Sequence, residues 1–161
     1  MENSSNNIDF RKRLTYREVE FSDCNLLFEW TNDPDVRLNS HNKEPVHYEN
    51  HVTWLKNKLA SSDSWLYIFS IEDEPVAILR LDKRDDDVLI SYSVTSEFRG
   101  KGIGKEIIFI LPKLIKDEGI QCNDIIAEVF KTNGASNKIF TSARYIKREE
   151  ENIFVYTRVL K

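Results

Sequence analysis

The chain is poor in cysteine, glycine and proline, and it contains no long hydrophobic run. Only two cysteines occur among its 161 residues, Cys24 and Cys122, and neither lies in a Cys-x-x-Cys or Cys/His spacing. A disulfide framework and a zinc site are therefore not expected, and we predict no bound metal. No apolar run approaches the roughly 20 residues of a membrane-spanning helix. The polar start, Met1–Asp9, also lacks the apolar segment of a signal peptide, so we expect a cytoplasmic protein.

The chain also has no excess of positive charge. Its 23 Lys and Arg residues are outnumbered by 27 Asp and Glu, which gives a net charge of −4 at pH 7. This balance argues against non-specific attraction to nucleic acid or to an anionic membrane, so neither is expected as a partner. A content of 40% hydrophobic and 31% charged residues is typical of a globular domain. We predict a disordered N-terminal tip over residues 1–12 and one domain over 13–161, as a monomer or homodimer.

Three of the five glycines fall within one segment, Arg99-Gly100-Lys101-Gly102-Ile103-Gly104. The run Val88–Val94 before it is rich in β-forming residues, as a half-buried strand should be. The residues after it repeat apolar side chains at helical spacing. Glycine lets the backbone approach a ligand closely, and the free N–H groups and the dipole of a helix start attract anions. Because the segment also carries positive charge, this junction predicts a site for a phosphorylated ligand.

Spacing decides between the known phosphate-binding loops. The nucleoside triphosphatase loop needs Gly-x-x-x-x-Gly-Lys-Ser/Thr, but Arg99 stands at its first glycine and Glu106 at its hydroxyl position. The dinucleotide loop needs Gly-x-Gly-x-x-Gly, which fails at Lys105 from one start and at Ile107 from the other. The pattern Arg-x-x-Gly-x-Gly fits at every position from Arg99 onward. A glycine-rich turn that merely begins a helix is the alternative.

The remaining pattern predicts a single α+β domain. Strands are expected near Leu14–Val19, Trp65–Ile71, Pro75–Leu81, Val88–Val94, Asp124–Val129, Tyr145–Lys147 and Asn152–Leu160. Helices are expected after the cap Ser22-Asp23, over Tyr48–Leu59, from the glycine segment to Gly119 and over Ala135–Ser142. Residues 35–47 have little periodicity and are expected to form a loop with at most a short helical turn. Pro112 lacks an N–H, so we expect a kink or an early break there. The order is βααβββαβαββ, with a mixed, mostly antiparallel central β-sheet flanked by helices.

This order, with Arg-x-x-Gly-x-Gly after the fourth strand, resembles the GNAT family of N-acetyltransferases over nearly the whole chain. The resemblance implies the GNAT fold and acetyl-coenzyme A (acetyl-CoA) as co-substrate, with its diphosphate on the glycine segment. It further implies that strands 88–94 and 124–129 splay apart at a bulge and that the pantetheine arm lies between them. The cofactor-binding residues implied in this way are Tyr92, Val94, Arg99, Gly100, Lys101, Gly102, Ile103, Gly104, Lys105, Asn133, Ser136 and Phe140.

A second landmark of that family is Asn-x-x-Ala/Ser-x-x-x-Tyr, normally followed by Gly-Phe. Asn133 and Ser136 match it, whereas Phe140 stands at the tyrosine and Arg144-Tyr145 at Gly-Phe. In the family the asparagine helps to hold the pantetheine arm, and the tyrosine commonly protonates the departing thiolate. Phenylalanine has no proton to donate, so the usual general acid is missing. A bound water, Ser136 or Tyr145 could carry the proton instead.

The first half of the chain contains a pattern that indicates which class of amine accepts the acetyl group. A pattern that resembles N-acetyltransferases of nucleotide-linked 4-amino sugars, as in pseudaminic acid biosynthesis, runs through Trp30-Thr31-Asn32, Val36-Arg37, His51 and Trp54. The residues expected to bind such a small-molecule amine are Trp30, Asn32, Arg37 and Lys43. Acetylation of protein N-termini, as by the ribosomal-protein acetyltransferases, is the alternative enzyme activity. The alternative that is not an enzyme is a non-catalytic domain that binds and senses acyl-CoA.

The implied chemistry is direct transfer, in which a neutral amine attacks the thioester carbonyl and the tetrahedral oxyanion expels the thiolate. Holding two reactants in line can contribute about 7–11 kcal/mol. The amine must lose a proton to water or to a base, and a base of near-neutral pKa contributes roughly 10²–10⁴-fold. This favours a histidine, although Asp87 and Glu44 are also candidates. The catalytic candidates are therefore His51, His47 and Asp87 for the base and Ser136 near the sulfur.

Overall fold

The computed structural model describes residues 13–160, and the tip expected over residues 1–12 lies outside them. The strands in this range are β1 (Leu14–Glu18), β2 (Ser64–Ile71), β3 (Glu74–Arg84), β4 (Asp87–Val94), β5 (Asp124–Phe130), β6 (Ile146–Glu149) and β7 (Ile153–Val159). The helices are α2 (Cys24–Thr31), α3 (Pro34–Leu38), α4 (Tyr48–Ala60), α5 (Ile103–Asp117) and α6 (Gly134–Ser142), with 3-10 turns at Phe21–Asp23 and Ser96–Phe98.

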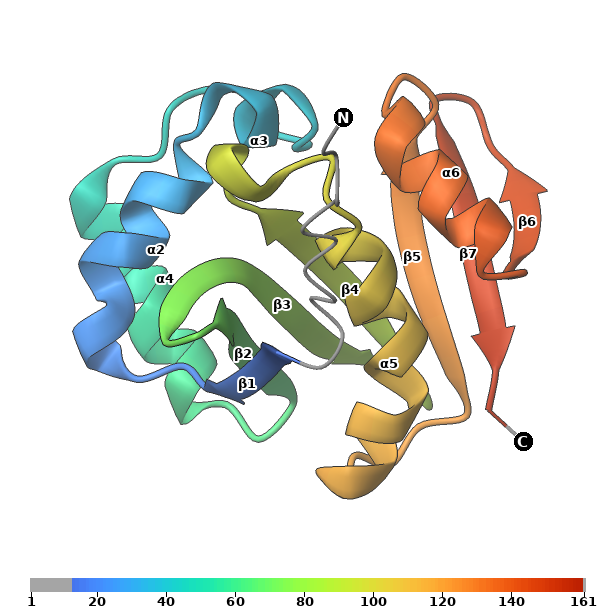
Figure 1. The fold of residues 1–161 in the computed structure, drawn as a ribbon, viewed down its shortest axis with the longest axis horizontal. Helices are drawn as coiled ribbons and strands as arrows, with labels where there is room; N and C mark the ends of the chain where they lie inside the picture. The colour runs from blue at the N-terminus through green and yellow to red at the C-terminus, as the bar shows by residue number, and fades with distance from the viewer. Residues whose placement is uncertain (1–12, 161) are drawn as a thin grey trace, which may run out of the picture.

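The strands form one seven-stranded sheet in the order β1-β2-β3-β4-β5-β7-β6. Neighbouring strands run antiparallel except β4 and β5, which are parallel. Figure 1 shows α5 and α6 lying over the strands from β4 to β7, while α2 and α4 lie together at the side of β2 and β3. The predicted α+β fold with a mixed, mostly antiparallel central sheet is therefore confirmed.

Alternation along the strands divides the apolar side chains between two cores. On β2, Tyr67 and Phe69 belong to the larger core beneath α5, whereas Leu66 and Ile68 belong to a smaller core with α2 and α4. Successive side chains of a strand point to opposite faces, so α5 and the pair α2–α4 cover opposite faces of the sheet. Full burial of each such side chain stabilises the fold by about 1.5–3 kcal/mol. Both faces of the central strands are thus fixed by packing.

Helix α5 passes through Pro112 without ending. It runs on to Asp117, so of the two outcomes expected at Pro112, a kink or an early break, the break is wrong. Proline removes one backbone hydrogen bond from a helix. The buried face of α5 outweighs this loss, because packing of an apolar face supplies most of the stability of a helix in a protein. That face is made by Ile103, Ile107, Ile108, Leu111, Leu114 and Ile115.

The segment between α2 and α4 contains the short helical turn that the sequence allowed within an expected loop. Helix α3 adds one short element to the predicted order. Asp33 caps α3, because its Oδ1 accepts hydrogen bonds from the N–H groups of Asp35 at 2.9 Å and Val36 at 3.4 Å. Pro34 occupies the first helical turn, where its missing N–H has no consequence. The Asp-Pro pair that ends α2 therefore also begins α3.

Arg144 adopts a left-handed backbone conformation at the end of α6, with φ of 62°. The N–H groups of Arg144 and Tyr145 close the helix on the carbonyls of Thr141 at 3.1 Å and Phe140 at 3.2 Å, a geometry that favours glycine. We expect Arg144→Gly to raise the free energy of unfolding by about 0.5–1 kcal/mol in urea. Lys138→Gly, in the exposed middle of the same helix, should lower it by a similar amount. A less stable Arg144→Gly protein would contradict the prediction.

Two further features concern membranes and metals. Among residues 13–160, no helix is both long enough and apolar enough to cross a membrane. Within the same range, no group of three or more His, Cys, Asp or Glu side chains is arranged to hold a metal ion. Cys24 is a buried free thiol and Cys122 a half-buried one.

Candidate active site

Strands β4 and β5 are paired at one end and open at the other. Their pairing ends at Leu89 and Ile126 after two residue pairs, although β4 continues to Val94 and β5 to Phe130. Figure 1 shows the two strands separating beyond this point. The bulge expected at the separation is not found, because β4 keeps one register with β3 along its whole length. The unpaired N–H and C=O groups of the two facing edges suit an extended chain that carries amide groups.

The glycine segment lies at this open end, between β4 and α5. Gly100 and Gly102 have φ values of 74° and 85°, in the left-handed region that favours glycine. The first hydrogen bond of α5 runs from the N–H of Glu106 to the carbonyl of Gly102 at 3.0 Å. The N–H groups of residues 103–105 precede it and have no backbone partner among residues 13–160. These N–H groups and the helix dipole have the features of an anion site at a helix start.

The other members of the segment divide between surface and core. Lys101 and Lys105 are exposed, so their charges lie near the anion site in solvent. The side chain of Ile103 is buried in the larger core. A Cβ added to Gly104 would lie 3.0 Å from Cε2 of Tyr92 and 3.2 Å from a methyl group of Ile139. Gly104 is therefore required for close packing between α5 and β4.

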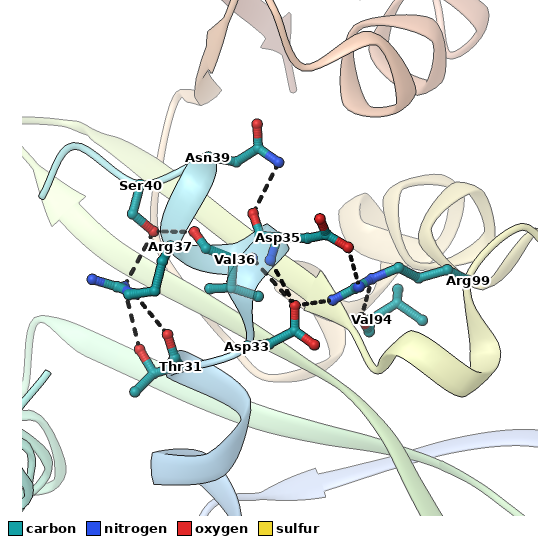
Figure 2. A network of polar contacts seen from close by, with 9 residues as sticks. All are labelled: Thr31, Asp33, Asp35, Val36, Arg37, Asn39, Ser40, Val94 and Arg99. Atoms are coloured by element: carbon teal, nitrogen blue, oxygen red, sulfur yellow. Dashed lines mark hydrogen bonds and ion pairs between the residues drawn. The ribbon is translucent and has the colours of Figure 1, made fainter. Parts of the chain in front are cut away.

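The Arg99 side chain is directed towards α3 (Figure 2). Its Nη1 lies 2.8 Å from Asp35 and its Nη2 lies 3.0 Å from Asp33. Its Nε donates to the carbonyl of Val94 at 3.0 Å. Arg99 thus joins the end of β4 to the start of α3. This differs from the expectation that Arg99 holds the diphosphate, because its charge is already paired within the protein.

The first turn of α6 faces the open end of β4. Asn133 caps the helix, with its Oδ1 accepting from the N–H of Ser136 at 3.3 Å. The Oγ of Ser136 lies 2.9 Å from the hydroxyl of Tyr92. Asn137, which carried no sequence signal, ties α6 to β5 by donating to the carbonyl of Phe130 at 2.9 Å. The structure therefore brings three of the expected cofactor residues to one place, namely Tyr92 of β4, Ser136 of α6 and Asn133, which caps α6.

Phe140 lies in the core, with 1% of its surface exposed. Its ring stacks on Tyr156 and meets the ring of Tyr145 edge-on, each at 5.1 Å between centroids. The hydroxyl of Tyr145 is buried and has no hydrogen-bond partner among residues 13–160. Burial raises the pKa of Tyr145 to about 12. The ring at position 140 thus serves packing, and the neighbouring phenol of Tyr145 is a weak acid.

A pocket of about 310 Å³ lies between the α2–α3 connection and the end of β4. Of the residues expected to bind the acceptor, Trp30 lines this pocket, whereas Asn32, Arg37 and Lys43 do not. Asn32 closes the loop after α2, because its side-chain amide both donates to and accepts from the backbone of Val46, at 3.0 and 2.8 Å. The carboxylate residues in the pocket lining are Glu29, Asp33, Glu74 and Glu97.

Arg37 fills the inside of the loop between α2 and α4. Its Nε donates to the carbonyl of Thr31 at 2.7 Å, its Nη1 to the carbonyl of Asn42 at 2.8 Å and its Nη2 to Ser40 Oγ at 3.2 Å. Figure 2 shows the guanidinium turned towards Thr31 and Ser40. Burial lowers the pKa of Arg37. Every guanidinium nitrogen is engaged inside the protein, so Arg37 shapes the loop and does not offer a donor to a substrate phosphate, contrary to expectation.

The same loop reaches across to β5, a contact that no pattern in the sequence indicated. The ring of His41 lies 5.1 Å from the ring of Phe130, and Nζ of Lys43 lies 5.0 Å from the same ring. Phe130 points to the face opposite the larger core, because its neighbour Val129 belongs to that core. Alternation along the strand could have predicted the direction of Phe130. No local signal predicts that a loop almost 90 residues earlier would meet it.

His51 is buried between α2 and α4, with 3% of its surface exposed. Its Nε2 lies 3.0 Å from the carbonyl of Cys24, and its ring stacks on Trp54 at 5.7 Å. Burial lowers the pKa of His51, although the hydrogen bond to the carbonyl acts in the opposite direction. A neutral His51 therefore joins two helices, and these contacts do not place it at the open end of β4 and β5.

The two other candidates for the base also lie elsewhere. His47 is exposed at the residue before α4, where its carbonyl accepts the hydrogen bond of the His51 N–H at 3.0 Å. Asp87 begins β4, and its Oδ1 accepts from the N–H of Asp124 at 3.1 Å. That contact helps to fix the paired end of β4 and β5. Of the four catalytic candidates, the structure brings Ser136 alone to the open end.

Comparison with known proteins identifies relatives of this arrangement. The family model for the acetyltransferase (GNAT) domain matches residues 13–145. Acetyltransferase PseH of Campylobacter jejuni is 23% identical over 147 residues, which cover 90% of each chain. A domain from Methanocaldococcus jannaschii has a TM-score of 0.79 at 21% identity, covering 91% of this chain and 97% of that one. The ribosomal-protein α-N-acetyltransferase RimL, solved with coenzyme A, has a TM-score of 0.78 at 14% identity, covering 91% and 94%.

The residues of the chain fit acetyl-CoA, the donor that this family uses. The N–H groups of residues 103–105 suit a diphosphate, and the open edges of β4 and β5 suit the two amides of the pantetheine arm. The family match extends over most of the chain, including both of these features. The chain therefore belongs to the GNAT family of acetyltransferases, and acetyl-CoA is its acetyl donor.

Proposed function

We propose that this acetyltransferase acts on the 4-amino group of a nucleotide-linked amino sugar. The observation that carries the proposal is the similarity to PseH over 90% of both chains. It agrees with the pattern of Trp30, Asn32, His51 and Trp54, which resembles acetyltransferases of that substrate class. RimL shares the fold at 14% identity, so protein N-terminal acetylation remains the alternative against which the proposal is tested.

In this proposal the protein acts mainly by alignment. Acetyl-CoA supplies the thioester, and main-chain groups of Tyr92 and Val94 bind its pantetheine amides along the open edge of β4. A backbone N–H on the same edge faces the carbonyl oxygen, where negative charge develops during attack. The acceptor amine approaches from the side of α2 and α3 and attacks in line. Such alignment can lower the barrier by about 7–11 kcal/mol.

The acceptor side offers two kinds of group to a nucleotide sugar. Lys43 uses one of its three donors on the carbonyl of Leu38 at 2.9 Å. Its other two donors have no hydrogen-bond partner among residues 13–160, so they can bind a phosphate. Phe130 provides a flat apolar surface beside Lys43 for a sugar or a base. At the pocket beside Trp30, carboxylates such as Glu29 and Glu97 attract a protonated amine before it loses its proton. An acceptor with an amine at one end and a diphosphate at the other matches this distribution.

Release of free thiol from acetyl-CoA tests the proposal. We expect a uridine-diphosphate-linked 4-amino sugar to be acetylated far faster than a peptide with a free N-terminus. Lys43→Met should raise the KM for the sugar nucleotide about tenfold, because one charge-assisted hydrogen bond is lost. Lys56→Met is the matched control, since Lys56 makes a similar contact with the ring of Phe21 on another surface, and it should change nothing.

Each other outcome contradicts the proposal in a different way. Faster acetylation of the peptide would favour the N-terminal acetyltransferase. Binding of acetyl-CoA without thiol release for any amine would favour a sensor. An equal effect of Lys43→Met on sugar nucleotide and peptide would show that Lys43 does not recognise the diphosphate.

A further inference from the structure

Tyr92 places a phenol hydroxyl at the open end of the β4–β5 pair. The residue lies beyond Leu89, where the pairing with β5 ends. Its ring packs on the first turn of α5, close enough that a Cβ at Gly104 would lie 3.0 Å from Cε2. Its hydroxyl lies 2.9 Å from Oγ of Ser136 in the first turn of α6. Tyr92 therefore reaches from the strand on one side of the opening to the helix on the other.

Two other tyrosines lie near Phe140, but the hydroxyl of one is already engaged in a hydrogen bond and that of the other is buried in the core. Three tyrosine rings contact Phe140, those of Tyr92, Tyr145 and Tyr156. Tyr156 donates its hydroxyl to Oδ1 of Asn137 at 2.7 Å, and the hydroxyl of Tyr145 is buried without a partner among residues 13–160. Tyr92 alone of the three joins the strand edge at the opening to α6.

We propose that Tyr92 is the catalytic residue that donates a proton to the sulfur of the departing coenzyme A. The proposal deepens the proposed function, because it rests on acetyl transfer from acetyl-CoA, but it does not depend on which amine is the acceptor. It assigns to a strand residue the task for which position 140 of this chain has no hydroxyl.

Acetyl transfer and protonation of the sulfur involve one bond formed at the carbonyl carbon and one bond broken there. The nitrogen lone pair forms the new bond to the carbonyl carbon, and the C=O electron pair moves onto oxygen. When the C=O bond reforms, the C–S bond breaks and its electron pair passes to sulfur. The Oη–H of Tyr92 donates to that sulfur, and Ser136, exchanging protons with water, returns a proton to the phenolate. The proton that the amine loses passes to water, so the products are the amide and the free thiol.

The surroundings of Tyr92 keep it in the donor form. Burial raises the pKa of Tyr92, and the hydrogen bond with Ser136 opposes this only in part. The phenol therefore stays protonated at neutral pH. Ser136 is itself a much weaker acid than a phenol, so it acts as a relay and positions Tyr92. Because its N–H is held by Asn133 at 3.3 Å, the relay sits on a capped helix start.

Titration of the coenzyme A thiol bound to the enzyme tests the contact without any acceptor. A hydrogen bond to the thiolate favours the charged form and lowers the thiol pKa. We expect the acid constant of bound coenzyme A, followed by thiolate absorbance, to be about tenfold smaller in Tyr92→Phe than in the wild type. The phenylalanine ring retains the packing against Gly104, so the coenzyme A Kd should be nearly unchanged. Tyr16→Phe is the matched control, because it removes a hydroxyl bonded to Glu118 at 2.9 Å on β1.

Turnover gives the second readout. We expect kcat to fall about a hundredfold in Tyr92→Phe, to fall less in Ser136→Ala and to stay unchanged in Tyr16→Phe. An unchanged acid constant of the bound thiol in Tyr92→Phe would overturn the proposal, as would an equal loss from Tyr145→Phe. Failure of the sugar nucleotide as acceptor would overturn the proposed function alone, because the thiol titration needs only coenzyme A.

Discussion

Replacing Gly104 by valine is expected to weaken coenzyme A binding about a hundredfold. A Cβ at this position would lie 3.0 Å from Cε2 of Tyr92 and 3.2 Å from a methyl group of Ile139. A branched side chain must therefore displace the Tyr92 ring or the first turn of α5. Overpacking of this kind costs about 1–3 kcal/mol. Displacement of the turn also moves the N–H groups at the start of α5 away from the positions that suit the diphosphate. Calorimetry with coenzyme A measures the loss.

The structure changes the physical reason for this expectation. From the sequence, a bulky residue at Gly102 or Gly104 would be expected to block the path of the diphosphate. In the structure, Gly104 instead faces the interior, where it allows α5 to approach β4. A protein with Gly104→Val that binds coenzyme A like the wild type would contradict the placement of the diphosphate on this helix start.

Gly102 and Gly119 provide a matched pair for backbone strain. Their φ values are 85° and 68°, and a Cβ on either would meet nothing within 4 Å. Alanine at each position should lower the free energy of unfolding by about 1 kcal/mol, because both must keep a left-handed conformation. Gly102→Ala alone should also weaken coenzyme A binding, since Gly119 lies at the other end of α5. Equal affinity in both variants would show that the loop conformation has no part in binding.

The fold was largely predictable because its elements have strong local patterns. The face of α5 repeats apolar residues at helical spacing, and the strands before it alternate or run apolar between turn residues. Pro112 was the exception, since a local rule against proline was outweighed by burial along the whole helix. The parallel pair β4–β5 and its short register depend on contacts between distant segments, so composition and periodicity did not predict them without the family resemblance.

The directions of the charged side chains could not be predicted in the same way. Arg99 and Arg37 both stand in patterns that suggest anion binding, yet Arg99 pairs with Asp33 and Arg37 bonds to the carbonyl of Thr31. A guanidinium satisfies its donors on whichever acceptors the fold brings near it, and those acceptors lie on other elements. The hydroxyl pair of Tyr92 and Ser136 escaped prediction for the same reason, since the two residues lie on different elements.

Arg99→Ala is expected to lower the free energy of unfolding by about 2 kcal/mol at pH 7, because it leaves a half-buried carboxylate without its charged donor. Arg99 also connects the end of β4 to the start of α3. The cap residue Asp33 and Val36 of α3 both line the pocket beside Trp30. We therefore expect the variant to raise the KM for the acceptor more than the Kd for coenzyme A. Urea unfolding and steady-state kinetics measure the two effects.

The stability loss in Arg99→Ala should depend on pH in a defined direction. Partial burial would raise the pKa of Asp33, but hydrogen bonds from Arg99 and from two backbone N–H groups outweigh it and hold the pKa below its ordinary value. The unfolded chain therefore binds this proton more readily than the folded protein, so the contact stabilises the fold above the ordinary pKa of about 3.9. That contribution is lost as the pH falls through the lowered pKa of Asp33. The free energies of unfolding of the wild type and Arg99→Ala should then converge on acidification.

Asp35→Asn is the control for this pH dependence. Asp35 also contacts Arg99, at 2.8 Å, but its side chain is 69% exposed, whereas that of Asp33 is 22% exposed. An exposed ion pair contributes little, about 0–1 kcal/mol, so Asp35→Asn should change stability much less than Asp33→Asn, which keeps a side-chain oxygen to cap α3. An equal gap between the wild type and Arg99→Ala at neutral and at acid pH would show that Arg99 stabilises this junction by packing and not by its charge.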